Sequence, residues 1–275
     1  MNRNETLAQG VLAREPAMLS QAITLAESNL AAHRAQAQDI LQRLLSRTGK
    51  AMRIGISGAP GGGKSRLIEA LGLRLIEQGH RVAVLAIDSS SQPGGGNTPD
   101  DKTRMAQLSL RDEAYVRHSL TSGHPDSDTR VSRESLLLCE AAGFDVILVE
   151  TVGVAQTEAG ISKMVDCCLL LVSGADDELQ SIEKGMLELA DIVAVNKADG
   201  NTINDAGQAR ATSTCQHALS LLQPASSWKP VALTCSATTG DGLDELWQNV
   251  RTHRRQMIDT GELVERREQQ RISWT

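Results

Sequence analysis

A glycine-rich segment at residues 58–65 constrains the fold of this chain more than any other feature of its sequence. The segment reads Gly-Ala-Pro-Gly-Gly-Gly-Lys-Ser and matches the pattern G-x-x-x-x-G-K-S/T in full. Residues 52–57 before it alternate as a short strand does, and apolar residues recur at helical spacing after it. Glycines between a strand and a helix let successive N–H groups point at phosphate oxygens, and the helix adds the positive end of its dipole. The segment therefore predicts a phosphate-binding loop for a nucleotide.

The rest of the chain alternates between apolar runs and helical patterns, which predicts an α/β fold with a doubly wound, mostly parallel sheet. Apolar runs bounded by polar turns, typical of buried parallel strands, occupy residues 82–87, 146–149, 168–172, 192–195 and 231–234. Helical patterns occupy residues 67–78, 133–142, 181–190, 203–222 and 243–254. Ligand chemistry is expected at the carboxyl ends of the strands.

Three parts are expected along the chain. Residues 1–48 form a helical extension with two helices between Pro16 and Leu45, and residues 49–250 form the P-loop domain. Residues 251–275 form a short helical tail. Arg254, Arg255, Arg266 and Arg267 alternate there with acidic residues, so we interpret the tail as a solvated surface of mixed charge.

Composition excludes several classes of function. The formal net charge of -6 and a pI near 5.6 argue against a nucleic-acid partner, and the scarcity of aromatic residues argues against base stacking. The five cysteines form no C-x-x-C pair and are expected to be reduced, mostly buried thiols. No apolar run approaches the ~20 residues that a membrane-spanning helix needs. We therefore expect a soluble cytoplasmic protein without a membrane partner.

The phosphate end of the site is predicted from the loop itself. Lys64 supplies a charge to the β- and γ-phosphates, and the Ser65 hydroxyl is placed to bind Mg²⁺. The remaining predicted contacts of the loop are Gly58, Pro60, Gly61, Gly62 and Gly63.

Carboxylates at strand ends are the candidates for completing a magnesium site. Asp88 and Glu150 each follow an apolar run, and Asp101 is a third candidate. Each of them alone also fits a loop carboxylate that caps a helix. Gly153, three residues after Glu150, is placed to meet the γ-phosphate with its backbone N–H. Residues 89–101 and 119–129 are polar segments beside this face, and we interpret both as mobile switch loops.

The base end is predicted from the tetrapeptide Asn196-Lys197-Ala198-Asp199, which follows a buried strand. The Asp199 carboxylate can accept two hydrogen bonds from guanine N1–H and its exocyclic amine, a donor pair that adenine lacks. Asn196 would brace the neighbouring loop and Lys197 would lay its stem along the base. Ser236 and Ala237 follow the last strand and would offer a backbone N–H to guanine O6. The expected nucleotide is therefore GTP or GDP rather than ATP.

These residues together resemble the MeaB/ArgK-type GTPases, relatives of the methylmalonic aciduria type A protein that act as chaperones of adenosylcobalamin-dependent acyl-CoA mutases. The resemblance runs from about Leu12 to Trp274. Besides the segments above, it rests on Asp101-Lys102-Thr103-Arg104-Met105, Asp177-Glu178-Leu179-Gln180 and Leu189-Ala190-Asp191-Ile192-Val193.

The resemblance implies a SIMIBI-class P-loop fold, Mg·GTP as substrate, and hydrolysis that stays slow until a mutase docks and orders the switch loops. GTP turnover would then gate the loading, protection or reactivation of the mutase's cobalamin cofactor. The resemblance also implies that Asp88, Asp101 and Glu150 form the cluster that binds the metal and orders water. Lys184 would belong to a third loop at residues 174–184 that signals to the partner, although it equally fits an ordinary lysine on a helix surface.

Three departures from the family pattern affect these expectations. Residues 122–128 lack the Gly-Gly pair that usually follows Ser-Gly-His-Leu, and Glu183 stands where a second lysine commonly precedes Lys184. Family members also continue into a helical dimerisation arm, which leaves the homodimer open for this chain.

Two other functions share the fold. A nickel- or metal-insertion GTPase is the first alternative, but the six histidines form no evident metal-delivery cluster in the sequence. A kinase of a transport protein is the second, and the sequence offers no obvious domain for binding an acceptor protein.

Overall fold

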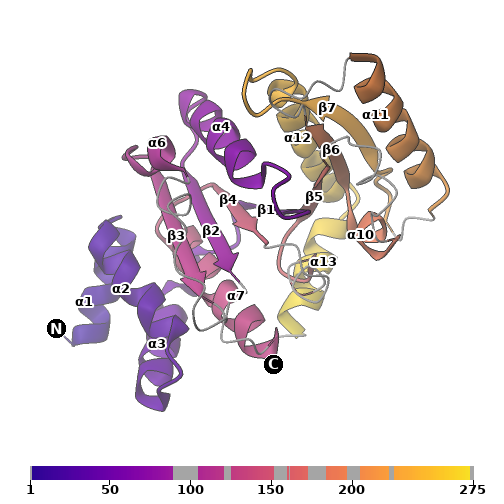
Figure 1. The fold of residues 1–275 in the computed structure, drawn as a ribbon. Helices are drawn as coiled ribbons and strands as arrows, with labels where there is room; N and C mark the ends of the chain where they lie inside the picture. Colours follow the sequence, from indigo (N-terminus) through magenta and orange to yellow (C-terminus); the bar gives the residue numbers. More distant parts are fainter. Residues whose placement is uncertain are drawn as a thin grey trace.

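The computed structural model describes residues 2–88, 105–120, 125–151, 160, 162–172, 184–196, 205–222 and 226–272. A seven-stranded sheet forms the centre of the molecule, and each neighbouring pair of strands is parallel (Figure 1). Its strands are β1 (Met52–Gly58), β2 (Val82–Asp88), β3 (Ala114–Leu120), β4 (Val146–Glu150), β5 (Cys167–Val172), β6 (Ile192–Asn196) and β7 (Val231–Cys235). The strand order is β3-β2-β4-β1-β5-β6-β7, so β1 lies between β4 and β5.

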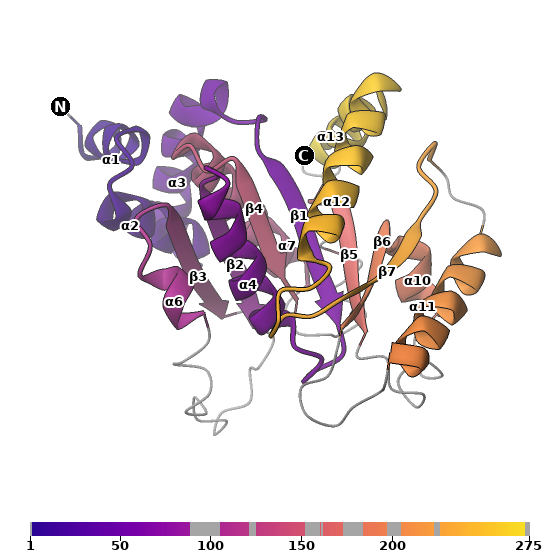
Figure 2. The same ribbon diagram turned by 90° about the horizontal axis from the view of Figure 1, so that it is seen from above.

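Helices cover both faces of the sheet, which confirms the predicted doubly wound α/β fold (Figure 2). The helices before β3 are α1 (Arg3–Leu12), α2 (Pro16–Glu27), α3 (Ala31–Leu44), α4 (Lys64–Glu77) and α6 (Ala106–Ser109). The later ones are α7 (Pro125–Ala141), α10 (Lys184–Leu189), α11 (Asp205–Ser220), α12 (Leu243–Asp259) and α13 (Glu262–Ile272). Helices α4, α6 and α12 pack on one face, and α1, α2, α3, α7, α10 and α11 pack on the other.

The register of the strands separates the two cores. Ile54, Leu148 and Val84 lie side by side in β1, β4 and β2, and all three face α4 and α12. Ala83 and Ile147, one position earlier, point to the opposite face and pack with α1, α2, α3 and α7. Strands buried on both faces need continuous apolar sequence, which is why the apolar runs predicted their positions well.

Strand β3 was not among the predicted strands, because its sequence contains Arg117 and His118 and does not form an apolar run. It lies at the edge of the sheet, where only β2 pairs with it. Its polar side chains bind Glu27 at the end of α2, including Ser119 Oγ at 2.6 Å from Glu27 Oε1. The expected loop over residues 119–129 is therefore wrong at both ends. Strand β3 continues to Leu120 and α7 begins at Pro125, while residues 121–124 lie outside the described residues.

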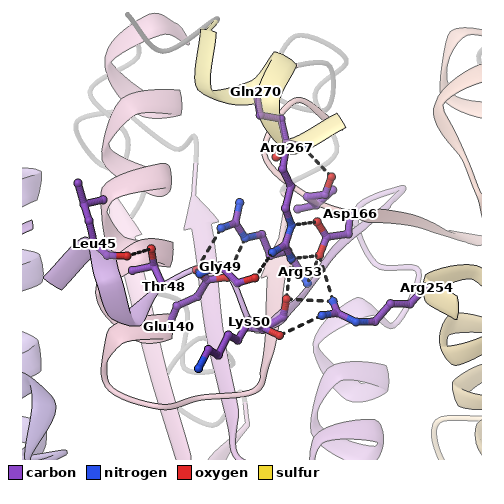
Figure 3. A network of polar contacts seen from close by, with 12 residues as sticks. Leu45, Thr48, Gly49, Lys50, Arg53, Glu140, Asp166, Arg254, Arg267 and Gln270 are labelled. Carbon is purple, nitrogen blue, oxygen red and sulfur yellow. Dashed lines mark hydrogen bonds and ion pairs between the residues drawn. The ribbon is translucent and has the colours of Figure 1, made fainter. Parts of the chain in front are cut away.

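The expectation of a solvated tail is also wrong for most of its arginines. Helix α12 runs through residue 251 without interruption, and α13 follows against the amino ends of the central strands. Arg267 forms a two-pronged pair with Asp166, from Nε to Oδ1 at 2.8 Å and from Nη2 to Oδ2 at 2.6 Å (Figure 3). Arg254 and Arg266 are likewise half-buried beside acidic groups, whereas Arg255 is exposed.

Buried carboxylates at the amino edge of the sheet explain why most of these arginines are not solvated. Asp166 precedes β5 and is 4% exposed, and a carboxylate at such depth needs cations or N–H donors. It receives them from Arg267 and from the backbone N–H of Arg53 at 3.0 Å. Arg53 in turn forms a buried two-pronged pair with Glu140 of α7. This charge network joins α13, β1 and α7 (Figure 3).

None of the helices in the described part of the chain is long and apolar enough to cross a membrane.

Candidate functional site

The glycine loop lies at the carboxyl end of β1 and leads directly into α4 (Figure 1). Two of its glycines are required by geometry. Gly58 has φ +144°, and a Cβ there would lie 2.2 Å from the carbonyl oxygen of Leu171 in β5. Gly63 caps α4 with φ +89°, and a Cβ there would lie 2.7 Å from Asn196 Nδ2. The loop is thus held closely against β5 and against the end of β6.

Lys64 is the first residue of α4 and is 7% exposed. Its ammonium group donates to the carbonyl oxygens of Gly58 at 2.7 Å and Ala59 at 2.9 Å. Its charge is therefore held within the loop, next to the N–H groups of the first turn of α4, which have no partners inside a helix. A buried cation and a helix amino terminus at one point form an anion site.

Ser65 contacts the carboxylate that ends β4. Its hydroxyl lies 2.8 Å from Glu150 Oε1, and Glu150 is 6% exposed. The register of the sheet explains the contact, because Glu150 pairs with Ile56 of β1 and with Ala86 of β2. A hydroxyl and a carboxylate together offer the oxygen ligands that Mg²⁺ prefers, so these two residues fit that ion.

Asn196, the last residue of β6, connects two loops. Its Nδ2 donates to the carbonyl oxygen of Gly62 at 3.3 Å, and its Oδ1 accepts the N–H of Ala237 at 3.2 Å. The amide therefore fixes the phosphate loop against the segment that follows β7. Figure 1 shows the glycine loop beside the β6 and β7 end of the sheet.

The segment after β7 is a tight turn from Ser236 to Gly242. Ser236 N–H donates to Asp241 O at 2.8 Å, and the Ser236 hydroxyl accepts the N–H of Thr239 at 3.2 Å. Gly242 has φ +72° and a Cβ there would lie 2.2 Å from Thr234 O, so the turn requires glycine. The sequence interpretation named Ser236 and Ala237 only. The signal for the rest of the turn was the Thr-Gly-Asp-Gly sequence at residues 239–242.

The structure thus brings together one set of the predicted site residues at the carboxyl edge of the sheet: Gly58, Pro60, Gly61, Gly62, Gly63, Lys64, Ser65, Glu150, Asn196, Ser236 and Ala237. Asp88 ends β2 and Lys184 begins α10, but the side chains of both lie outside the described part. Asp101, Gly153, Lys197 and Asp199 lie outside the described residues altogether.

All five cysteines are free thiols, as the sequence predicted. Four of them are buried and Cys168 is half-buried. Burial raises the pKa of Cys235, at the end of β7, to about 12, so this thiol stays protonated at neutral pH.

Comparison with known proteins places the chain in a family. Residues 19–275 match the family model described as "Methylmalonyl Co-A mutase-associated GTPase MeaB". A probable GTPase of Mycobacterium tuberculosis is 51% identical over 98% of this chain and 80% of its own length. GTPase ArgK of Escherichia coli is 41% identical over 94% of this chain and 78% of its own length. The mouse protein named methylmalonic aciduria type A homolog, mitochondrial, is 43% identical over 98% of this chain and 68% of its own length.

Solved structures agree with the fold. The crystal structure of a LAO/AO transport system kinase superposes on this chain with a TM-score of 0.84 at 34% sequence identity. The match covers 100% of this chain and 83% of the kinase chain. HypB from Helicobacter pylori superposes with a TM-score of 0.50 at 16% identity over 78% of this chain and 93% of that one, a likeness of fold alone.

The family model spans nearly the whole chain, and bacterial relatives of 41% to 51% identity are named GTPases. The resemblance found in the sequence is therefore confirmed, and the chain is a GTP hydrolase that belongs to the MeaB family.

Proposed function

We propose that this GTPase is a magnesium-dependent chaperone that gates cobalamin loading, protection or reactivation in an adenosylcobalamin-dependent acyl-CoA mutase. The family description names a mutase association, and a mammalian relative is named after methylmalonic aciduria. The observation that carries the proposal is the convergence of Lys64, the Ser65–Glu150 pair and the Asn196 bridge at one edge of the sheet. Five free cysteines fit a reducing compartment, so the proposal places the protein in the cytoplasm.

At the phosphate end, we assign the loop from Gly58 to Gly63 to hold the phosphates through its N–H groups. Lys64 would leave its two carbonyl partners, at least in part, to neutralise the β- and γ-phosphates. Ser65 and Glu150, with Asp88 and Asp101, would hold Mg²⁺ directly or through water. The ion, when bound, neutralises charge that develops on the phosphates during transfer.

At the base end, Asp199 selects guanine and Lys197 covers the ring, as the tetrapeptide predicts. The described contacts of Asn196 support this assignment, because they fix the start of the tetrapeptide to both the phosphate loop and Ala237. Ser236 and Ala237 would line the base from the side of β7.

Coupling to the mutase is assigned to the segments that adjoin the carboxyl edge of the sheet. Gly153 follows β4 by three residues, so movement after Glu150 would report the γ-phosphate. Lys184 begins α10 and is proposed to carry the signal to the partner. A docked mutase would order these segments and so raise the rate of hydrolysis.

The test is the GTPase rate of the purified chain with and without an acyl-CoA mutase of the same organism. We expect a several-fold rise in rate that requires Lys64, so that Lys64→Ala abolishes both the basal and the stimulated rates. Complex formation should also depend on the nucleotide. A rate that no cobalamin mutase changes would contradict the proposal and would favour the metal-insertion alternative.

A further inference from the structure

A second group of reactive side chains lies at the amino edge of the sheet, opposite the glycine loop. Cys167 begins β5, Asp191 directly precedes β6, and His253 lies in α12, which packs on these strands. One candidate ligand atom from each residue lies within 4.8 Å of the others, and all three residues are buried. The nucleotide site uses none of them.

His253 is the residue that requires explanation. It is 1% exposed, and neither ring nitrogen has a hydrogen-bond partner among the described residues. Trp228 contacts the imidazole in a T-shaped arrangement, with 5.1 Å between the ring centroids. The Nε2 atom of His253 lies 3.5 Å from Asp191 Oδ1. Burying an imidazole without hydrogen-bond partners costs free energy unless a further group binds it.

The two carboxylate oxygens of Asp191 have different neighbours. Oδ2 accepts the N–H of Cys168 at 2.8 Å and lies 3.5 Å from Arg266 Nη1. Oδ1 faces His253. A carboxylate with one oxygen fixed by the protein and the other directed at an imidazole is oriented as metal-binding carboxylates are by their outer hydrogen bonds.

The distances suit a tetrahedral ion. A nitrogen and an oxygen that both bind Zn²⁺ at about 2.0–2.2 Å lie about 3.4 Å apart, close to the observed 3.5 Å. The longest separation in the group, at most 4.8 Å, needs a closure of about 1 Å, which small rotations of Cys167 and His253 supply.

The donor set also selects the ion. A sulfur, an imidazole nitrogen and a carboxylate oxygen together favour Zn²⁺ or Co²⁺ over Mg²⁺, which prefers oxygen alone. The Cys167 thiol releases its proton to solvent on binding, so that a thiolate and a carboxylate balance the charge of the ion. We propose that Cys167, Asp191 and His253 bind one Zn²⁺ ion that fastens α12 to the amino ends of β5 and β6. The fourth position is left to a water molecule.

Cobalt titration of the full chain tests the site, because Co²⁺ reports its ligands by colour. The protein is treated with a chelator, kept reduced and free of nucleotide, and titrated with Co²⁺ in excess Mg²⁺ to occupy oxygen sites. We expect one equivalent to bind, with a thiolate-to-cobalt charge-transfer band and the visible bands of a tetrahedral ion. One equivalent of Zn²⁺ should abolish both the charge-transfer band and the visible bands of cobalt.

Two variants assign the ligands. Cys167→Ala should lose the charge-transfer band, while Cys139→Ala, which removes another buried thiol from a different core, should keep it. His253→Gln should weaken cobalt binding at least about tenfold. Zinc at a hundredfold excess over its Kd should raise the Tm of the unmodified chain by about 5 °C or more, and should not raise that of Cys167→Ala.

A titration of the unmodified chain without a charge-transfer band would overturn the proposal, whether or not a variant folds. A band that persists in Cys167→Ala would overturn it as well. Either result would leave His253 and Asp191 as a simple ion pair in which Cys167 has no part.

Discussion

Asn196 holds the two ends of the nucleotide site together through a single side-chain amide. One side of the amide donates to Gly62 and the other accepts from Ala237. Gly63 makes room for this amide, because a Cβ at that position would lie 2.7 Å from Nδ2. The geometry of both loops therefore depends on a glycine that the motif requires and on an asparagine well over a hundred residues later in the chain.

Alanine substitution at two glycines separates this contact from backbone strain. Gly63 and Gly61 have φ values of +89° and +82°, so both alanine variants carry a similar left-handed strain of about 1–2 kcal/mol. Only Gly63→Ala displaces Asn196, since a Cβ at Gly61 meets nothing within 4 Å. We expect Gly63→Ala to bind GDP about tenfold more weakly than Gly61→Ala, the equivalent of about one lost hydrogen bond. Fluorescent GDP titration measures the difference, and equal affinities would exclude a role for Asn196 in holding the loop.

Asp199 is predicted to choose the base. Asp199→Asn replaces an acceptor with a group that can donate, so we expect the preferred nucleotide to change from guanine to xanthine. Competition against fluorescent GDP measures the preference of each variant. ATP should not compete in either protein, and effective competition by ATP in the unmodified chain would refute the guanine assignment.

Among the elements, α13 shows how burial changes the meaning of a charged sequence. The alternation of Arg and Glu in residues 251–272 is typical of a solvated helix, yet Arg267 is 17% exposed and binds Asp166, which is 5% exposed at its side chain. Charge alternation cannot show which charges meet a buried carboxylate on another strand. The partner lies about a hundred residues earlier in the chain.

Two arginines on α13 provide a matched test of this network. Arg267→Gln leaves Asp166 with the N–H of Arg53 and the more distant Arg254, so we expect a loss of about 1–3 kcal/mol in the free energy of unfolding. Arg271 pairs with Glu268 at the surface and is 73% exposed, so Arg271→Gln should cost less than about 0.5 kcal/mol. Urea denaturation at constant nucleotide concentration measures both. Equal losses would show that the network does not stabilise the fold.

For the whole molecule, the sequence predicted the features that depend on local pattern. Apolar runs located five of the strands, the alternation of residues 52–57 located β1, and the glycine motif located the loop between β1 and α4. Asn196 was expected to brace a neighbouring loop, and the structure identifies its partners. These predictions succeed because a buried parallel strand needs a continuous apolar sequence.

What the sequence could not predict depends on contacts between distant segments. Edge strand β3 uses polar residues that α2 covers, and the position of α2 is set by the tertiary fold. The grouping of Cys167, Asp191 and His253 joins two strands and a helix at separations that no metal motif contains. The spacing of the six histidines along the chain carries no information on such a group.

The central claim is that one guanine nucleotide extends from the glycine loop to the loops after β6 and β7. A crystal structure of the full chain with GDP and Mg²⁺ tests it most directly. We predict phosphates on the backbone of residues 58–65, the ion on Ser65, and the base between Asp199 and Ala237. A purine bound away from Asp199, or an ion bound without Ser65, would contradict the account.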